Sequence, residues 1–207
     1  MLSSKSIKFS VIIPAHNSEA FLHKAISSIK SQVFTDYELI VVCDACDDGT
    51  EAVARAYADK VIVTDYGRDG LARQAGMDAA EGEFVLFMDD DDWWLHEYVL
   101  NVLNDYAEQI RNFDVLCFGF IWKGIGYTGP IRYIEGRQTL WPNVWSKMYR
   151  HGWLGRNGIR FGDQNMDSDL WFNRSVMEHD PELAFLDQPM YYYNYMRSGS
   201  QTEQAHR

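Results

Sequence analysis

The sequence is poor in cysteine and in basic residues, and it has no long apolar run. Three cysteines in 207 residues, Cys43, Cys46 and Cys117, are too few for a scaffold held together by disulfides. The longest apolar runs, residues 84–88 and 115–122, are far shorter than the ~20 residues that a membrane-spanning helix needs. The N-terminus also has no apolar stretch of signal-peptide length. We therefore expect a protein of the reducing cytoplasm without a transmembrane segment.

Basic residues are outnumbered by acidic ones. The chain has 19 Lys and Arg against 30 Asp and Glu, which gives a net charge of −11. Because phosphate backbones bind to basic faces, we expect no nucleic-acid partner, whereas a metal site built from carboxylates is compatible with this charge. Hydrophobic residues make up 46% of the chain and charged residues 24%, as in folded proteins. No linker-like or repeated segment divides the chain, so we predict a single domain over residues 1–207.

The first half alternates strand-like with helix-like segments. In chain order we predict strand 9–14, a helix capped by Ser18, strand 38–42, helix 49–58, strand 61–63, helix 71–80 and strand 83–88. The strands are apolar throughout rather than alternating, which is typical of parallel strands covered on both faces. Strand–helix repetition at ~25-residue spacing indicates an α/β fold with a Rossmann-like, mostly parallel sheet flanked by helices. Such sheets bind ligands at the carboxyl ends of their strands.

The second half differs in composition. Residues 113–207 contain 18 of the 30 aromatic residues. We predict a strand over 114–122, a loop-rich segment over 124–136, and short helices over 142–149 and 167–178. We interpret this aromatic-rich part as an extension of the same domain.

Four adjacent carboxylates, Asp89 to Asp92, directly follow the strand predicted over residues 83–88. Adjacent carboxylates raise one another's pKa values unless a cation is present. Alternate residues of an extended segment point the same way, so Asp89 and Asp91 would face one hard cation such as Mg²⁺ or Mn²⁺. The alternative is a solvated acidic loop, which is less favoured directly after a buried strand.

Three further residues each allow two interpretations. Asp44, at the end of the second strand, is either an acceptor for a nucleotide N–H or O–H group or a loop carboxylate ahead of the 47–50 turn. Arg73, in the first turn of a predicted helix, either pairs with a diphosphate or is a surface arginine. Asp169 is either a general base near the metal or a helix N-terminal carboxylate that the dipole favours.

The spacing of Cys43 and Cys46 occurs in redox and zinc sites. Zinc needs four ligands, and only one other cysteine exists, remote in sequence. We interpret both as small core or loop residues.

Seven segments together resemble glycosyltransferase family 2, the metal-dependent nucleotide-sugar transferases of GT-A fold. Each occurs in the order that the family has: residues 11–17, 41–50, 72–76, 80–93, 144–149, 168–172 and 193–200. The resemblance covers residues 9 to 202. It implies a nucleotide-binding half over about residues 9–112 and a short, aromatic-rich acceptor half over about residues 113–207.

The resemblance also implies an activity. It is the inverting transfer of a sugar from a UDP-sugar to a hydroxyl of a glycan or lipid-linked acceptor, with Mn²⁺ or Mg²⁺ on the diphosphate. A lipid-linked acceptor would bring the protein to the cytoplasmic face of a membrane as a peripheral protein.

The roles that the resemblance implies fall into four groups. Nucleotide contacts would come from Pro14, Ala15, His16, Asn17, Asp44, Arg73, Asp89 and Asp90. The metal would be bound by Asp91 and Asp89. The donor or acceptor would be positioned by Asp92, Trp93, Asp167 and Lys147. The base that deprotonates the acceptor would be Asp169.

The chain departs from the family's pattern at two informative positions. Cys43 replaces the first Asp of a usual pair, and Ser168 replaces the Glu before the catalytic Asp, so Asp167 is a second candidate base. These departures keep open a catalytically silent nucleotide-sugar or metal-binding module. A nucleotidyltransferase is disfavoured, because it needs a basic, Gly-rich triphosphate loop and residues 14–17 contain neither Gly nor Lys.

Overall fold

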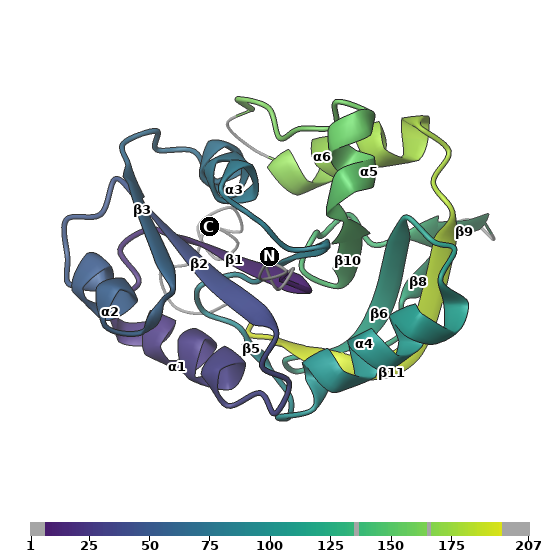
Figure 1. The fold of residues 1–207 in the computed structure, drawn as a ribbon, viewed down its shortest axis with the longest axis horizontal. Helices are drawn as coiled ribbons and strands as arrows, with labels where there is room; N and C mark the ends of the chain where they lie inside the picture. Colours follow the sequence, from purple (N-terminus) through teal and green to yellow (C-terminus); the bar gives the residue numbers. More distant parts are fainter. Residues whose placement is uncertain (1–6, 135–136, 165–166, 196–207) are drawn as a thin grey trace, which may run out of the picture.

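The computed structural model describes residues 7–134, 137–164 and 167–195 (Figure 1). Part of the 193–200 motif lies outside the described residues. The first elements in chain order are β1 (Phe9–Ala15), α1 (Glu19–Lys30), β2 (Tyr37–Asp44), α2 (Thr50–Tyr57), β3 (Lys60–Thr64), α3 (Asp69–Asp78), β4 (Phe84–Phe87), β5 (Trp93–Trp94) and α4 (Val99–Ile110). The others are β6 (Val115–Trp122), β7 (Gly126–Thr128), β8 (Ile131–Ile134), β9 (Arg137–Leu140), β10 (Lys147–Arg150), α5 (His151–Arg156), α6 (Ser168–Glu178) and β11 (Leu183–Tyr193).

One mixed sheet forms the centre of the molecule, with strand order β3-β2-β1-β4-β10-β6-β11-β5 and β7 beside β6. The four N-terminal strands are parallel to one another, and so are β6 and β11. The predicted α/β fold with a mostly parallel sheet flanked by helices is confirmed. The chain winds outward from β1 to β3 and then returns to place β4 on the other side of β1. Such a reversal opens a ligand-binding crevice at the carboxyl ends of the two strands.

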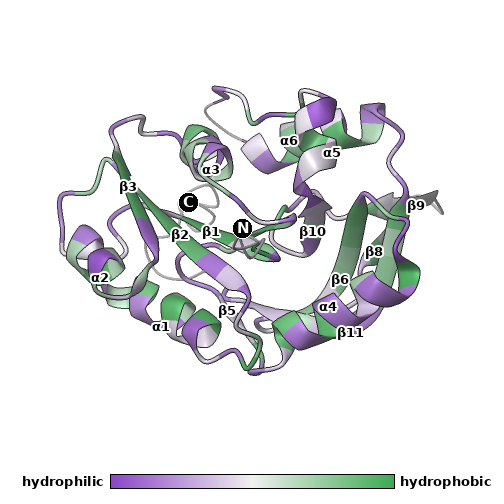
Figure 2. Ribbon diagram, viewed as in Figure 1, coloured by the Kyte–Doolittle hydropathy of each residue, from purple (hydrophilic) through white to green (hydrophobic). Residues whose placement is uncertain are grey.

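Helices cover both faces of the sheet (Figure 1). One apolar core lies between the sheet and α1, α2 and α4, and a second lies under α3, α5 and α6. In Figure 2 β6 and most of β2 are apolar, β10 is largely polar, and the helices carry both polar and apolar residues. Helix α3 packs closely on the sheet, because a Cβ added at Gly76 would lie 2.4 Å from Cγ2 of Ile12. This close approach brings the side chains of α3 to the strand ends.

The prediction of a helix over residues 142–149 is wrong. This segment forms a turn followed by β10, which pairs antiparallel with both β4 and β6. Met148 and Tyr149 alternate between the two apolar cores, as neighbouring residues of a strand do. Burial between two strands therefore outweighs the local helical pattern.

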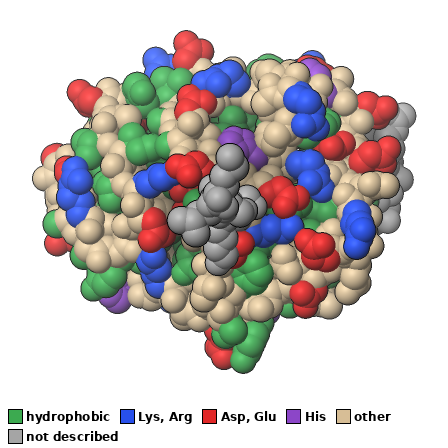
Figure 3. All heavy atoms as spheres, in the orientation of Figure 1, with side chains coloured by type: hydrophobic (Ala, Val, Ile, Leu, Met, Phe, Trp, Pro, Cys, Tyr) green, Lys and Arg blue, Asp and Glu red, His purple; other side chains and the backbone are tan. Residues whose placement is uncertain are grey.

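Other elements of the second half were also missed. The segment predicted as loop-rich contains β7 and β8, and β11 was not predicted; in the first half, α4 was missed as well. No helix in the described part of the chain has the length and apolar character needed to cross a membrane. Acidic and basic side chains are interspersed over the face shown in Figure 3.

Candidate active site

The turn after β1 connects three strand ends. The backbone N–H of His16 donates to Oδ2 of Asp90 (3.3 Å), and its Nδ1 lies 2.7 Å from the backbone carbonyl of Asp44. A carbonyl only accepts hydrogen bonds, so Nδ1 is the donor in this contact. Asn17 adopts a left-handed conformation (φ 47°), and its side-chain oxygen accepts the N–H of Asp47 (2.9 Å). The structure thus brings residues 14–17, Asp44 and Asp90 together, as predicted.

The carboxylate of Asp44 is buried and holds a loop. It accepts hydrogen bonds from Oγ1 of Thr64 (2.9 Å) and from the backbone N–H groups of Tyr66 (2.6 Å) and Arg68 (2.9 Å). We had interpreted Asp44 either as a nucleotide contact or as a loop carboxylate, and these hydrogen bonds fit the loop carboxylate. The loop is the one after β3, however, and not the predicted 47–50 turn. A carboxylate has about four lone-pair positions, and these three hydrogen bonds leave one for a ligand. A nucleotide contact by Asp44 therefore stays a prediction.

The acidic segment forms a tight turn rather than the extended strand end that we predicted. The N–H of Asp92 donates to the carbonyl of Asp89 (3.2 Å), and each carboxylate has different surroundings. Asp89 pairs with Arg73, while Asp90 accepts from His16. The argument from alternating side chains in an extended segment is therefore wrong.

Asp92 is fully buried, which corrects the expectation that it positions a donor by contact. Its carboxylate accepts from the hydroxyl of Tyr191 (2.6 Å) and from the N–H of Asn194 (2.7 Å). The same Tyr191 hydroxyl accepts the N–H of Asp89 (3.1 Å). Asp92 thus fixes the shape of the acidic turn against β11.

The acidic turn fits a hard divalent cation that takes most of its ligands from elsewhere. Burial raises the pKa of Asp89 to about 7; Arg73 opposes this rise, and the charges of Asp169 and Asp91 add to it. A nearby cation would favour the charged form. In the described residues, no three His, Cys, Asp or Glu side chains are grouped to hold a metal by themselves. Mg²⁺ and Mn²⁺ fit here, because such ions use one or two carboxylates plus phosphate and water.

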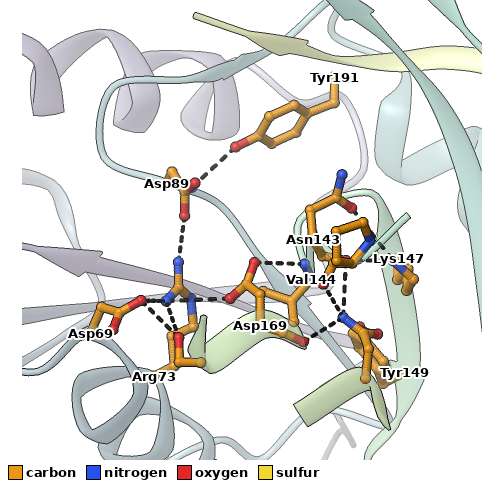
Figure 4. Close-up of polar contacts among 12 residues, drawn as sticks. Asp69, Arg73, Asp89, Asn143, Val144, Lys147, Tyr149, Asp169 and Tyr191 are labelled. Atoms are coloured by element: carbon orange, nitrogen blue, oxygen red, sulfur yellow. Dashed lines mark hydrogen bonds and ion pairs between the residues drawn. The ribbon is translucent and has the colours of Figure 1, made fainter. Parts of the chain in front are cut away.

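Arg73 connects three carboxylates of the site (Figure 4). It is only 5% exposed, and its guanidinium contacts Oδ2 of Asp69 (2.5 Å), Oδ1 of Asp89 (2.7 Å) and Oδ1 of Asp169 (3.5 Å). Burial lowers the pKa of Arg73, but these three carboxylates raise it above its ordinary value. The surface-arginine interpretation is therefore wrong. Asp69 was not predicted, although its position four residues before Arg73 on one helix is the spacing of an ion pair.

Asp169 lies in the first turn of α6 and has two different carboxylate oxygens. Oδ2 accepts the N–H of Val144 (3.0 Å). Oδ1 is buried and has no hydrogen-bond partner among the described residues, apart from the longer ion pair to Arg73. Burial raises the pKa of Asp169; Arg73 and the Val144 N–H oppose the rise, and Asp69 adds to it. A carboxylate with one oxygen held and the other without a hydrogen-bond donor can accept a proton from a ligand.

The turn that carries Val144 is held by buried polar side chains (Figure 4). The ammonium of Lys147, 1% exposed, donates to the carbonyls of Trp141 (2.7 Å) and Asn143. Asn173 donates to the carbonyls of residues 142, 143 and 169 and accepts from the hydroxyl of Tyr149 (2.9 Å). Lys147 therefore positions the turn and, as a correction to our expectation, does not reach a donor or acceptor directly.

Two residues around α6 clarify the departures from the family's pattern. The hydroxyl of Ser168 donates to Oδ2 of Asp69 (2.8 Å), and a Cβ at Gly70 would lie 3.0 Å from the Cβ of Ser168. Position 168 thus packs closely against α3, and Asp69 supplies a carboxylate beside Arg73. Asp167 is exposed and precedes the helix in a left-handed conformation (φ 58°). Asp169, not Asp167, is the candidate base inside the cluster.

Trp93 is packed within the protein. Its ring stacks on Tyr192 with centroids 4.2 Å apart, and the ammonium of Lys24 lies 2.9 Å from its centroid. One ring face cannot hold both groups, so both faces are covered. Trp93 therefore has no free ring face for stacking on a sugar, and its part in positioning the donor or acceptor by other contacts stays a prediction.

The fold and the site together define a class: a sheet reversal with an acidic turn after β4 and an opposed carboxylate on α6 is the arrangement of a GT-A nucleotide-sugar transferase. The sequence profile of the family described as "Glycosyl transferase family 2" matches residues 10–166. The chain belongs to this family.

Relatives and solved structures agree with this assignment. TarS of Staphylococcus aureus (strain Mu50 / ATCC 700699), described as a poly(ribitol-phosphate) beta-N-acetylglucosaminyltransferase, is 29% identical over 219 residues. That alignment covers 97% of this chain but 38% of TarS, so the chain spans about two fifths of that relative. The crystal structure of S. aureus TarS 1-349 with UDP-GlcNAc superposes with a TM-score of 0.78 at 26% identity, over 95% of this chain and 60% of that one.

A more distant structure shares the fold alone. The mannosyltransferase PcManGT of Pyrobaculum calidifontis, in complex with GDP-Man and Mn²⁺, has a TM-score of 0.69 at 16% identity, over 93% of this chain and 58% of that one.

Proposed function

We propose that this chain catalyses the inverting transfer of a sugar from a UDP-sugar to a hydroxyl group of a glycan or polyol-phosphate polymer. The observation that carries the proposal is the buried Arg73, which joins the acidic turn after β4 to the Asp169 oxygen that has no hydrogen-bond donor among the described residues. UDP-GlcNAc is the donor to test first, because TarS was crystallised with it. The polymer acceptor follows from the description of the same relative.

The proposed reaction needs a base, a leaving group and a fixed geometry between them. The turn after β1 and the loop held by Asp44 would bind the uridine. A Mg²⁺ or Mn²⁺ ion held by Asp89 and Asp91 would neutralise charge on the diphosphate. Oδ1 of Asp169 takes the proton of the acceptor hydroxyl, whose oxygen bonds to the anomeric carbon. The bond from that carbon to the diphosphate oxygen breaks, UDP leaves with the electron pair, and the configuration inverts.

Nucleotide binding is the first expectation of this proposal that can be measured. At ~100 times its dissociation constant, UDP with Mn²⁺ adds about 2.7 kcal/mol of stability, which raises the melting temperature of a domain of this size by roughly 5–10 °C. We expect the shift to need Mn²⁺ and to disappear in Asp91→Asn but not in the control Glu51→Gln, an exposed residue of α2. A shift with GDP or CDP instead of UDP would change the donor class. Thermal unfolding without any nucleotide-dependent shift would contradict the site.

The Asp69 carboxylate is expected to tune the candidate base. In Asp69→Asn, Arg73 loses one of its three carboxylate partners, so its charge acts more strongly on Asp169. Asp69 itself raises the pKa of Asp169, and its removal lowers that pKa. We expect kcat to fall roughly tenfold, as for coupled residues in one network, with the KM for the donor unchanged and the acidic limb of the pH profile moved to lower pH.

The matched control for Asp69→Asn is Glu51→Gln, which also removes the acidic partner of an arginine four residues later on a helix, but on the surface. Equal rates for Asp69→Asn and wild type across the pH range would show that Asp69 has no role in tuning Asp169.

A further inference from the structure

We propose that the outer side of α6 carries a second subsite, which binds a polyhydroxylated unit of the acceptor chain away from the unit that reacts. The proposal rests on the proposed transferase function. Its first observation is a cavity of about 550 Å³ between α6 and residues 160–164. Trp171 and Arg174 border it from the helix, and Arg160 and Gln164 border it from the preceding segment.

Helix geometry separates this cavity from the candidate base. Trp171, Ser175 and Glu178 follow one another at spacings of four and three residues and therefore share one face of α6. Asp169 and Trp171 are two positions apart, which places them about 200° apart around the helix axis. The cavity thus lies across a helix about 10 Å thick from Asp169. It cannot hold the attacking hydroxyl, but it can hold another unit of the same chain.

A residue that borders the cavity has a polar atom without a hydrogen-bond partner in the described part of the chain. Oε1 of Gln164 is buried, and no described residue donates a hydrogen bond to it. A buried acceptor without a donor is costly, and rotation of the Gln164 amide toward the cavity would let a ligand hydroxyl supply the donor. The amide of Gln164 lies over Gly162, because a Cβ added there would be 2.4 Å from Oε1. A substituted side chain at position 162 would therefore displace this amide.

The walls add an aromatic surface and spare N–H donors. Trp171 is 46% exposed although it is a large aromatic residue, and the Arg174 guanidinium lies 5.5 Å from its ring centroid. Arg160 and Arg174 form exposed ion pairs with Asp78 and Glu178, each through one nitrogen. A guanidinium has five N–H donors, so both retain donors for hydroxyl or phosphate oxygens. An indole face beside amide and guanidinium donors suits a sugar or polyol unit.

Binding of two acceptor probes tests the subsite directly. Isothermal titration calorimetry would measure a ribitol-phosphate hexamer and a neutral hexasaccharide, maltohexaose, against the wild type and two pairs of variants. We expect Trp171→Ala and Gly162→Ala to weaken binding of at least one probe roughly tenfold. The controls are Leu170→Ala, an exposed apolar residue of the same helix that is not part of the cavity lining, and Gly155→Ala, where an added Cβ meets no atom within 4 Å. Both controls should bind like the wild type.

The two probes identify the source of the hydroxyl groups. Binding of the hexamer alone indicates a polyol-phosphate chain, and binding of maltohexaose alone indicates a neutral glycan. If neither probe binds the wild type, or if Trp171→Ala binds as tightly as Leu170→Ala, the subsite is refuted.

Transfer kinetics separate this inference from the proposed function. With a hexameric acceptor, Trp171→Ala should raise the acceptor KM and leave kcat unchanged, whereas a dimer too short to reach across α6 should show no difference. If Trp171→Ala transfers the sugar to the hexamer with the same KM and kcat as the wild type, the subsite is overturned and the transferase proposal stands. Probe binding that depends on Trp171, without transfer from any UDP-sugar, would overturn the transferase instead.

Discussion

Asp169→Asn is expected to lower the rate of sugar transfer by about 10²- to 10⁴-fold, the usual contribution of a positioned general base. The amide has nearly the shape of the carboxylate, so its oxygen can still accept the N–H of Val144. It cannot take a proton from the acceptor hydroxyl at neutral pH. Single-turnover transfer would measure the loss, and UDP titration should give an unchanged dissociation constant, because the proposed role of Asp169 is toward the acceptor and not toward the nucleotide.

Asp167→Asn is the matched control for this result. Asp167 is exposed and lies just before the helix that carries Asp169. We expect nearly wild-type transfer from it. A large loss in Asp167→Asn with little loss in Asp169→Asn would assign the base to the other carboxylate. Activity retained in both variants would contradict the mechanism.

Arg73→Met is expected to have the largest effect on stability. The substitution removes a buried cation and leaves the partly buried carboxylates of Asp69, Asp89 and Asp169 without it. Breaking a buried ion pair by removing one partner typically costs about 3–5 kcal/mol. For a domain of this size, that lowers the melting temperature by roughly 6–20 °C. Arg73→Lys should recover only part of the loss, because an ammonium group cannot reproduce the fork of a guanidinium.

Arg55→Met is the control for Arg73→Met. Arg55 also pairs with a carboxylate four residues earlier, but the pair is exposed on α2. Exposed pairs contribute about 0–1 kcal/mol, so thermal unfolding should show little change. A melting temperature for Arg73→Met as high as that for Arg55→Met would show that the three carboxylates do not depend on this cation.

The N-terminal half of the fold was predictable because its signals are local. Runs of apolar residues between helical segments predict parallel strands, and β1 to β4 follow that prediction. The second half depends on contacts between distant segments. Residues 147–150 become a strand only because they pair with β4 on one side and β6 on the other. These two strands lie about 60 and about 30 residues earlier in the sequence. No local pattern in that segment contains this information.

The sequence predicted which residues belong to the candidate site better than it predicted their contacts and burial. The residues after β1, β2 and β4 were placed together correctly, because parallel strand ends share one edge of the sheet. The burial of Asp92 was missed because its partner Tyr191 comes from the distant strand β11. The burial of Lys147 was missed because residues 142–149 were predicted as a helix, whereas they form a turn whose carbonyls surround the ammonium, followed by β10. Asp69 was also missed, although its spacing to Arg73 was a usable signal.

The most direct test of the central claim needs no acceptor. In proton NMR, UDP-GlcNAc with α configuration would be incubated with the protein and Mn²⁺, so that water replaces the acceptor hydroxyl. Inversion at this site predicts that the first GlcNAc released is the β anomer, observed before mutarotation, and that Asp169→Asn releases almost none. First release of the α anomer, or equal release by Asp169→Asn, would contradict inverting transfer with Asp169 as the base.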